Sequence, residues 1–128
     1  MNIALDIDGT ITKHPEFFAI VSRSIRASGG KVYIVTSRSN SDGVRVETQK
    51  ELKSYGIAFD ELIIIPDAKT EQTPCSHDEL DWYQKYLYQK VTVCLEYEVA
   101  IVFEDDQKVI DLFKMYAPDI QVMKVCYP

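Results

Sequence analysis

Short apolar runs alternate with amphipathic stretches along almost the whole chain. The runs lie at residues 3–7, 31–36, 61–65, 99–103 and 120–125, and the stretches between them place apolar residues at helical spacing. Strands that are apolar throughout and alternate with helices are typical of a parallel sheet covered by helices on both faces. We therefore predict a single α/β domain, a three-layer sandwich with a mainly parallel central sheet.

Two stretches are less regular than the others. Residues 79–98 begin with a helical pattern, but their second half, VTVCLEYEV, alternates as a strand does. We expect a helix that reaches to about Tyr97, with a strand as the alternative for the second half. Residues 66–78 form the one long polar stretch, and loops of this length are typically functional.

The composition limits the partners and the compartment. The 128 residues carry a formal net charge of −6, which argues against non-specific binding to nucleic acid, because that binding needs a basic surface. No apolar run approaches the ~18 residues of a membrane span. Because a core strand is predicted from residue 3, we expect no signal peptide. The widely spaced Cys75, Cys94 and Cys126 predict neither a disulfide framework nor a zinc site, so a cytoplasmic protein is expected.

Polar residues follow three of the predicted strands. Asp6 and Asp8 follow the first strand, Thr36 and Ser37 follow the second, and residues 104–106 (Glu-Asp-Asp) follow the fourth. In a parallel sheet the carboxyl ends of the strands meet at one edge, which is where ligands bind. We therefore expect these groups to gather at a single site.

The residue types at this edge predict magnesium and phosphate chemistry. Clustered carboxylates repel one another unless a cation or protons neutralise them, and oxygen ligands without histidine or thiolate suit Mg²⁺. An extended strand would point Asp6 and Asp8 the same way, so that one acts as nucleophile and the other as acid and base. Gly9 would let the backbone bend away after the pair.

Four features in order resemble the haloacid dehalogenase-like (HAD) phosphohydrolase superfamily. They are DIDGT at residues 6–10, the strand VYIVTSR at 32–38, a lysine on the helix before the fourth strand, and IVFEDD at 101–106. The resemblance implies a Rossmann-like core domain over residues 1–128. It also implies a Mg²⁺-dependent phosphatase that hydrolyses a phosphomonoester through an aspartyl-phosphate intermediate.

The same resemblance assigns roles to individual residues. Asp6 would be the nucleophile, and Asp8 would be the general acid and base and would offer its backbone carbonyl to Mg²⁺. Asp105 and Asp106 would complete the metal site beside Asp6, which is also expected as a ligand, with Asp106 expected as the closer ligand of the two. The residues expected to bind the substrate are Gly9, Thr10, Thr36, Ser37 and Arg38.

Two assignments stay open between alternatives. Lys90, fifteen positions before Asp105, suits the helix-borne lysine of the family, whereas Lys69 is its rival in the loop after the third strand. We favour Lys90 as the catalytic lysine. Arg38 would either grip a second phosphate bidentately or bridge nearby acidic side chains.

The gaps after the first motif and after the third strand are too short for a separate cap domain. The resemblance therefore points to an uncapped or minimally capped member acting on a phosphorylated small molecule, such as a nucleotide or a sugar phosphate. A homodimer that covers the open site fits this interpretation. The alternatives are a phosphoryl transferase, a non-catalytic HAD-like module that binds a metal or a partner, and a signalling receiver domain, whose order of acidic residues fits poorly.

Overall fold

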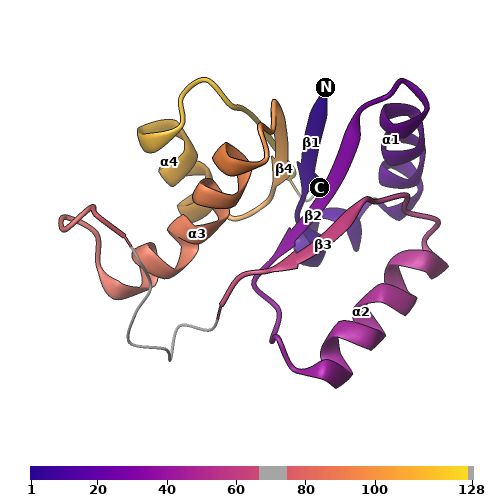
Figure 1. Ribbon diagram of the computed structural model, residues 1–128, viewed down its shortest axis with the longest axis horizontal. Helices are drawn as coiled ribbons and strands as arrows, with labels where there is room; N and C mark the ends of the chain where they lie inside the picture. Colours follow the sequence, from indigo (N-terminus) through magenta and orange to yellow (C-terminus); the bar gives the residue numbers. More distant parts are fainter. Residues whose placement is uncertain (67–74, 127–128) are drawn as a thin grey trace.

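The computed structural model describes residues 1–66 and 75–126, and it is an α/β sandwich of three layers (Figure 1). A five-stranded sheet forms the middle layer, and all four pairs of neighbouring strands are parallel. The predicted fold class is thereby confirmed. Among the described helices, none combines the length and the apolar character that crossing a bilayer requires.

The strand order places the amino-terminal strand in the centre of the sheet. The strands are β1 (Asn2–Leu5), β2 (Lys31–Thr36), β3 (Glu61–Ile64), β4 (Ile101–Glu104) and β5 (Gln121–Lys124), in the order β3-β2-β1-β4-β5. The chain thus adds β2 and β3 on one side of β1 before it crosses to the other side for β4 and β5. Such a change of direction opens a crevice at the carboxyl ends of the strands, beside β1.

Helices of the described residues cover both faces of the sheet (Figure 1). Helices α1 (Pro15–Ala27) and α2 (Asp42–Ser54) lie on one face, and α3 (Trp82–Glu96) and α4 (Gln107–Tyr116) lie on the other. Helix α3 continues to Glu96, so the alternative of a strand in its second half is wrong. Its start is held by a capping box, in which Asp81 and Gln84 each bond the backbone N–H of the other.

Side-chain alternation along β1 and β2 builds two separate apolar cores. Leu5 and Ile34 point to the α1 and α2 face, where they join Phe18 in one buried cluster. Ala4 and Val35 point to the opposite face and join the buried residues of α3 and α4. A central strand that is buried on both faces carries little polar character until it ends.

The end of β1 corrects one expectation from the sequence. The strand stops at Leu5, two residues earlier than predicted, and the chain then enters a π-helical turn over Ile7–Ile11. Asp8 and Gly9 have non-helical backbone angles inside this turn, and Gly9 has a φ of +84°. Asp6 and Asp8 therefore do not sit on one extended strand.

Candidate active site

A polar pocket of about 460 Å³ opens at the carboxyl ends of β1, β2 and β4. Its position beside β1 is the crevice that the strand order creates. It brings together polar residues from all three strand ends that the sequence singled out. The described lining residues are Asp6, Asp8, Thr36, Ser37, Tyr83, Leu87, Lys90, Glu104, Asp105, Asp106, Gln107 and Val109.

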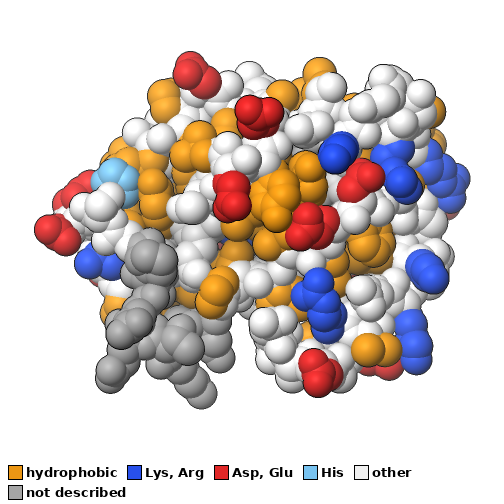
Figure 2. All heavy atoms as spheres, viewed as in Figure 1, with side chains coloured by type: hydrophobic (Ala, Val, Ile, Leu, Met, Phe, Trp, Pro, Cys, Tyr) orange, Lys and Arg blue, Asp and Glu red, His pale blue; other side chains and the backbone are white. Residues whose placement is uncertain are grey.

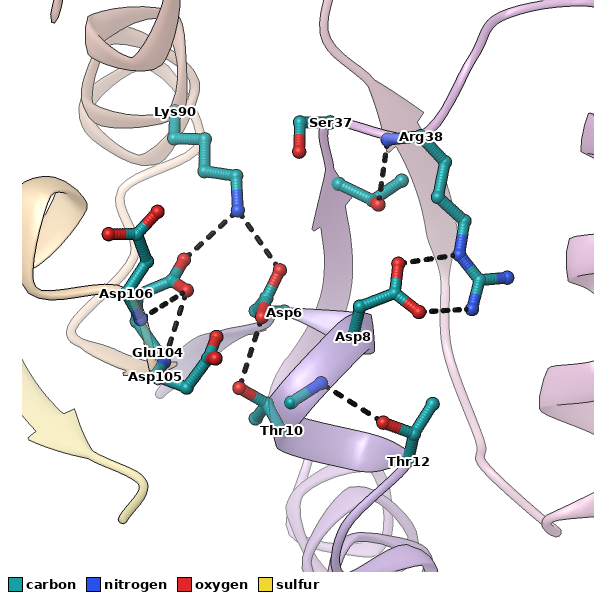
Figure 3. A network of polar contacts seen from close by, with 12 residues as sticks. Asp6, Asp8, Thr10, Thr12, Ser37, Arg38, Lys90, Glu104, Asp105 and Asp106 are labelled. Atoms are coloured by element: carbon teal, nitrogen blue, oxygen red, sulfur yellow. Dashed lines mark hydrogen bonds and ion pairs between the residues drawn. The ribbon is translucent and has the colours of Figure 1, made fainter. Parts of the chain in front are cut away.

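Lys90 reaches into this pocket from the buried face of α3. Its side chain shares that face with Leu87 and Val91, and the residue is only 5 % exposed. The ammonium Nζ lies 3.0 Å from Asp6 Oδ1 and 3.0 Å from Glu104 Oε2 (Figure 3). A buried lysine that forms two ion pairs is not an ordinary surface lysine. The rival Lys69 lies outside the described residues.

Glu104 belongs to the site, although the sequence analysis gave it no role of its own. It is 2 % exposed, and its second oxygen, Oε1, accepts the backbone N–H groups of Asp105 at 3.1 Å and Asp106 at 3.2 Å. The sequence carries a signal for it, because Val102 and Glu104 share a face of β4. An acidic residue that continues a buried face needs a buried partner, and Lys90 is that partner.

The site collects more negative than positive charge. Asp6, Glu104 and Asp105 each offer a carboxylate oxygen, and these oxygens lie within 4.8 Å of one another. Burial raises the pKa of Glu104 to about 8 and raises the pKa of Asp6, while Lys90 opposes both shifts. Burial alone would lower the pKa of Lys90, but the two carboxylates outweigh it, so that the pKa of Lys90 is raised.

This donor set fits a hard divalent cation. Grouped carboxylates without histidine or thiolate among them suit Mg²⁺ rather than zinc or copper. The single ammonium of Lys90 cannot balance three ionised carboxylates. A cation or protons must supply the remaining positive charge.

The geometry separates Asp105 from Asp106. Asp105 directs its carboxylate toward Asp6 and belongs to the oxygen cluster (Figure 3). Asp106 caps α4 instead, since its Oδ1 accepts the backbone N–H of Lys108 at 2.9 Å. The expectation that Asp106 is the closer metal ligand therefore does not match the arrangement, in which Asp105 is the closer residue.

The turn after β1 holds the Asp6 carboxylate from the other side. The Thr10 hydroxyl donates to Asp6 Oδ2 at 3.1 Å, so both oxygens of Asp6 have a donor. The backbone N–H of Gly9 donates to the Thr12 hydroxyl at 3.0 Å. Gly9 and Thr10 were expected to bind the substrate, but both are buried and neither is among the described lining residues.

Asp8 turns away from Asp6 and pairs with Arg38 (Figure 3). The Arg38 guanidinium donates to both Asp8 oxygens, at 2.9 and 2.7 Å, and it also lies 2.8 Å from Glu51. These hydrogen bonds lower the pKa of Asp8. Of the two interpretations of Arg38, the structure agrees with the second, in which Arg38 bridges the acidic side chains of Asp8 and Glu51. Arg38 is not among the described residues that line the pocket.

Thr36 and Ser37 line the pocket from the end of β2. The Thr36 hydroxyl oxygen accepts the backbone N–H of Arg38 at 3.1 Å, which leaves its own proton to donate. The Ser37 carbonyl accepts the hydroxyl of Tyr86 at 3.2 Å, a bond that ties this loop to α3. Two of the five expected substrate-binding residues therefore face the pocket.

Comparison with known proteins supports the fold and leaves the activity open. No family model and no curated protein matches the chain. A chain of the Pnkp1/Rnl/Hen1 complex is similar over 98 % of this chain, with a TM-score of 0.66 and 19 % identity. A chain of the Pnkp1/Rnl/Hen1 RNA repair complex has the same coverage, TM-score and identity. This chain spans 46 % and 42 % of the lengths of those two chains, respectively.

A third solved structure is similar over nearly its whole length. A universal stress protein from Archaeoglobus fulgidus gives a TM-score of 0.53 at 13 % identity, with 98 % of this chain and 93 % of that one covered. At such identities a likeness shows the shared α/β fold alone. What the pocket does must therefore be argued from its own residues.

Proposed function

We propose that this chain is a Mg²⁺-dependent, HAD-like phosphatase that hydrolyses a phosphomonoester through an aspartyl-phosphate on Asp6. The observation that carries the proposal is the buried contact of Lys90 with Asp6 and Glu104 beside Asp105. Burying several carboxylates around one lysine costs stability. Such a cost is typical of a site that needs these charges for its chemistry.

Asp6 would act as the nucleophile. Lys90 and Thr10 each donate to one oxygen of Asp6, and these two hydrogen bonds fix the orientation of the carboxylate at the end of β1. An Asp6 oxygen would form a bond to phosphorus while the bond from phosphorus to the leaving oxygen breaks. A water oxygen would then attack the phosphorus, releasing phosphate and restoring the Asp6 carboxylate.

Asp8 would move the protons in both steps. It would protonate the leaving oxygen in the first step and take a proton from the attacking water in the second. In its pair with Arg38 the pKa of Asp8 is lowered, so the carboxylate is ionised and holds no proton. To donate one, Asp8 must first leave Arg38, and its 64 % exposed side chain has room to do so.

The remaining residues would serve the phosphoryl group and the metal. Thr36 would donate its free hydroxyl proton to a phosphoryl oxygen, and Lys90 would balance the charge that develops there. Asp6 and Asp105 would hold Mg²⁺ together with the Asp8 backbone carbonyl. When bound, the ion supplies positive charge to the phosphoryl oxygens.

The net charge, the fold likeness and the cysteines of the chain bear on its substrate and its compartment. The net charge of −6 favours a small phosphorylated substrate over long nucleic acid. Because a chain of an RNA repair complex has a similar fold, the substrates tested should include phosphorylated oligonucleotides. Cys75, Cys94 and Cys126 are free thiols, which suits the reducing cytoplasm. We also propose a homodimer that covers the pocket.

Phosphate release tests this proposal. The wild type is assayed with p-nitrophenyl phosphate, nucleotides, sugar phosphates and phosphorylated oligonucleotides, in Mg²⁺ or in EDTA. Asp6→Asn is the inactive variant, and Asp119→Asn, which changes an exposed aspartate outside the pocket, is the matched control. We expect turnover that needs Mg²⁺ and is lost only in Asp6→Asn. Turnover in EDTA, or in Asp6→Asn, would refute the proposal. Mg²⁺ binding without turnover on any substrate would favour the non-catalytic alternative or transfer to an untested acceptor.

A further inference from the structure

The Arg38 guanidinium is shared between two carboxylates and one hydroxyl. Its Nε donates to Asp8 Oδ2 at 2.9 Å, and its Nη2 donates to Asp8 Oδ1 at 2.7 Å (Figure 3). On the other side, Nη1 donates to the hydroxyl of Thr48 at 3.2 Å, and Nη2 lies 2.8 Å from Glu51 Oε2. Thr48 and Glu51 both belong to α2, so Arg38 connects this helix to the turn that carries Asp8.

The two ends of this network differ in their exposure to solvent. Thr48 is only 1 % exposed, whereas the side chain of Asp8 is 64 % exposed. The Arg38 side chain bonds to both and is 19 % exposed. The guanidinium is therefore held in place by α2, and Asp8 is the partner that has room to move.

Glu51 has an unsatisfied oxygen in this arrangement. Its Oε2 atom is buried and makes no hydrogen bond within the part of the chain that the structure describes, although Arg38 Nη2 is close to it. In the same geometry Nη2 donates to Asp8. A buried carboxylate oxygen without a donor costs stability, and Oε2 would gain a donor if the guanidinium turned toward it. Glu51 and Asp8 therefore compete for the same guanidinium.

Glu51 differs in this respect from the surface ion pairs of the same helix. Charged side chains of both signs gather over α2 in the space-filling view (Figure 2). Glu47 and Lys50 form such a pair at 3.6 Å, and both side chains are exposed. Pairs of this kind contribute little to stability. Glu47 is therefore a suitable control, because its described ion pair is with Lys50 and not with Arg38.

We propose that Glu51 is a positioning residue, which takes over the Arg38 guanidinium when Asp8 moves to the substrate. This inference rests on the proposed function, because it serves the step in which Asp8 protonates the leaving oxygen. Asp8 can reach that oxygen only after its two bonds to Arg38 break. Arg38 keeps its charge throughout, so a second carboxylate that accepts the freed N–H groups lowers the cost of the exchange. Glu51 is that carboxylate, and it already lies 2.8 Å away.

Unfolding measurements give a test that does not depend on turnover. A double-mutant cycle of Asp8→Ala and Arg38→Met, measured by urea unfolding in EDTA, gives the coupling free energy between the two side chains. The cycle is repeated in Glu51→Met and in Glu47→Met. We expect a larger coupling free energy in Glu51→Met, because Asp8 then holds Arg38 without a competitor, and no change in Glu47→Met. Direct repulsion between Glu51 and Asp8 cancels in the cycle. An unchanged coupling in Glu51→Met would overturn the proposal.

Two kinds of substrate test whether this competition serves the reaction. p-Nitrophenolate leaves phosphorus without needing a proton, whereas an alkoxide leaving group needs one from Asp8. In Glu51→Met, kcat/KM for an alkyl phosphomonoester should fall about fivefold while kcat/KM for p-nitrophenyl phosphate is unchanged. In the Arg38→Met background the same substitution should affect neither substrate. An equal fall for both substrates, or an effect that persists without Arg38, would overturn the proposal.

The two readouts separate this inference from the proposed function. If the coupling free energy rises in Glu51→Met but no phosphomonoester is hydrolysed by the wild type, the phosphatase is wrong while the shared guanidinium stands. If phosphomonoesters are hydrolysed but Glu51→Met changes neither the coupling nor the substrate preference, the positioning role is wrong while the phosphatase stands.

Discussion

The ammonium of Lys90 lies 3.0 Å from the carboxylate of Asp6, although 84 positions separate the two residues in the chain. Asp6 follows the central strand β1, and Lys90 projects from the buried face of α3. The pair forms only when the chain has crossed from one side of β1 to the other. The candidate site is therefore a consequence of the topology as a whole.

Removing the Lys90 charge should destabilise the fold and abolish activity. Lys90→Met would leave Asp6 and Glu104 buried without their cation, which costs about 3–5 kcal/mol of unfolding free energy. Urea unfolding in EDTA measures this loss, and Mg²⁺ should recover part of it by replacing the missing charge. Lys53→Met, on the exposed side of α2, is the control and should unfold like the wild type. A loss equally small in both variants would contradict the buried ion pairs.

Replacing Asp105 by alanine should mainly lower Mg²⁺ affinity, whereas replacing Asp106 by alanine should mainly lower stability. Asp105→Ala removes an oxygen from the cluster with Asp6 and Glu104, so Mg²⁺ affinity should fall at least tenfold in isothermal titration calorimetry. Asp106→Ala removes the cap of α4, so the free energy of unfolding should fall by about 1 kcal/mol while Mg²⁺ binding changes little. The reverse pattern would make Asp106 the ligand and refute this assignment.

The sequence predicts most of the fold because burial leaves a strong pattern. Strand β2 matches its apolar run KVYIVT residue for residue, since a strand buried on both faces stays apolar until it ends. The parallel order then places Asp6, Thr36 and the acidic residues after β4 at one edge. For that reason the elements and the general place of the pocket could be predicted.

Side-chain directions could not be predicted, because they depend on backbone turns and distant partners. Asp8 points to Arg38 since the chain leaves the strand at Leu5 and turns through the positive φ of Gly9. Glu104 gains its role only from Lys90, a residue on a helix that packs above it. Neither relationship is visible in local spacing.

The Arg38 pair should lower the measured pKa of Asp8. An ordinary aspartate has a pKa of about 3.9. In the folded wild type, a carbon-detected NMR titration should give Asp8 a pKa below that ordinary value, because Arg38 donates to both of its oxygens. In Arg38→Met the pKa should return upward. Arg26→Met, which removes a pair with Asp60 instead, should leave the pKa of Asp8 unchanged.

The same pair fixes the sign of a pH effect on stability. The pKa of Asp8 is depressed in the folded state, so its stabilisation is present above the unfolded pKa and is lost as pH falls through the folded one. Because Asp8 is mostly exposed, its share is at most about 1 kcal/mol. The difference in unfolding free energy between wild type and Arg38→Met should therefore shrink below about pH 4. A difference that grows with acid would contradict the pairing.

The cysteines should differ in their reactivity toward a thiol reagent. Burial raises the pKa of the Cys94 thiol to about 12, so almost no thiolate is present at neutral pH. Cys126 is exposed and should react with Ellman's reagent at once, whereas Cys94 should react only after unfolding in urea. Cys94→Ala is the control that identifies the slow thiol. Rapid labelling of Cys94 in the native protein would contradict the packing of α3 against the sheet.

Covalent labelling of Asp6 tests the central claim most directly. Wild type is mixed with Mg²⁺ and the best substrate of the phosphate-release assay, quenched in acid within one turnover, and its peptides are weighed by mass spectrometry. We predict one phosphoryl group on the peptide that contains Asp6, released by hydroxylamine as an acyl phosphate is, and absent in Asp6→Asn. Phosphate release without any labelled intermediate, or a label on Asp8 or another residue, would contradict the assignment of Asp6 as the nucleophile.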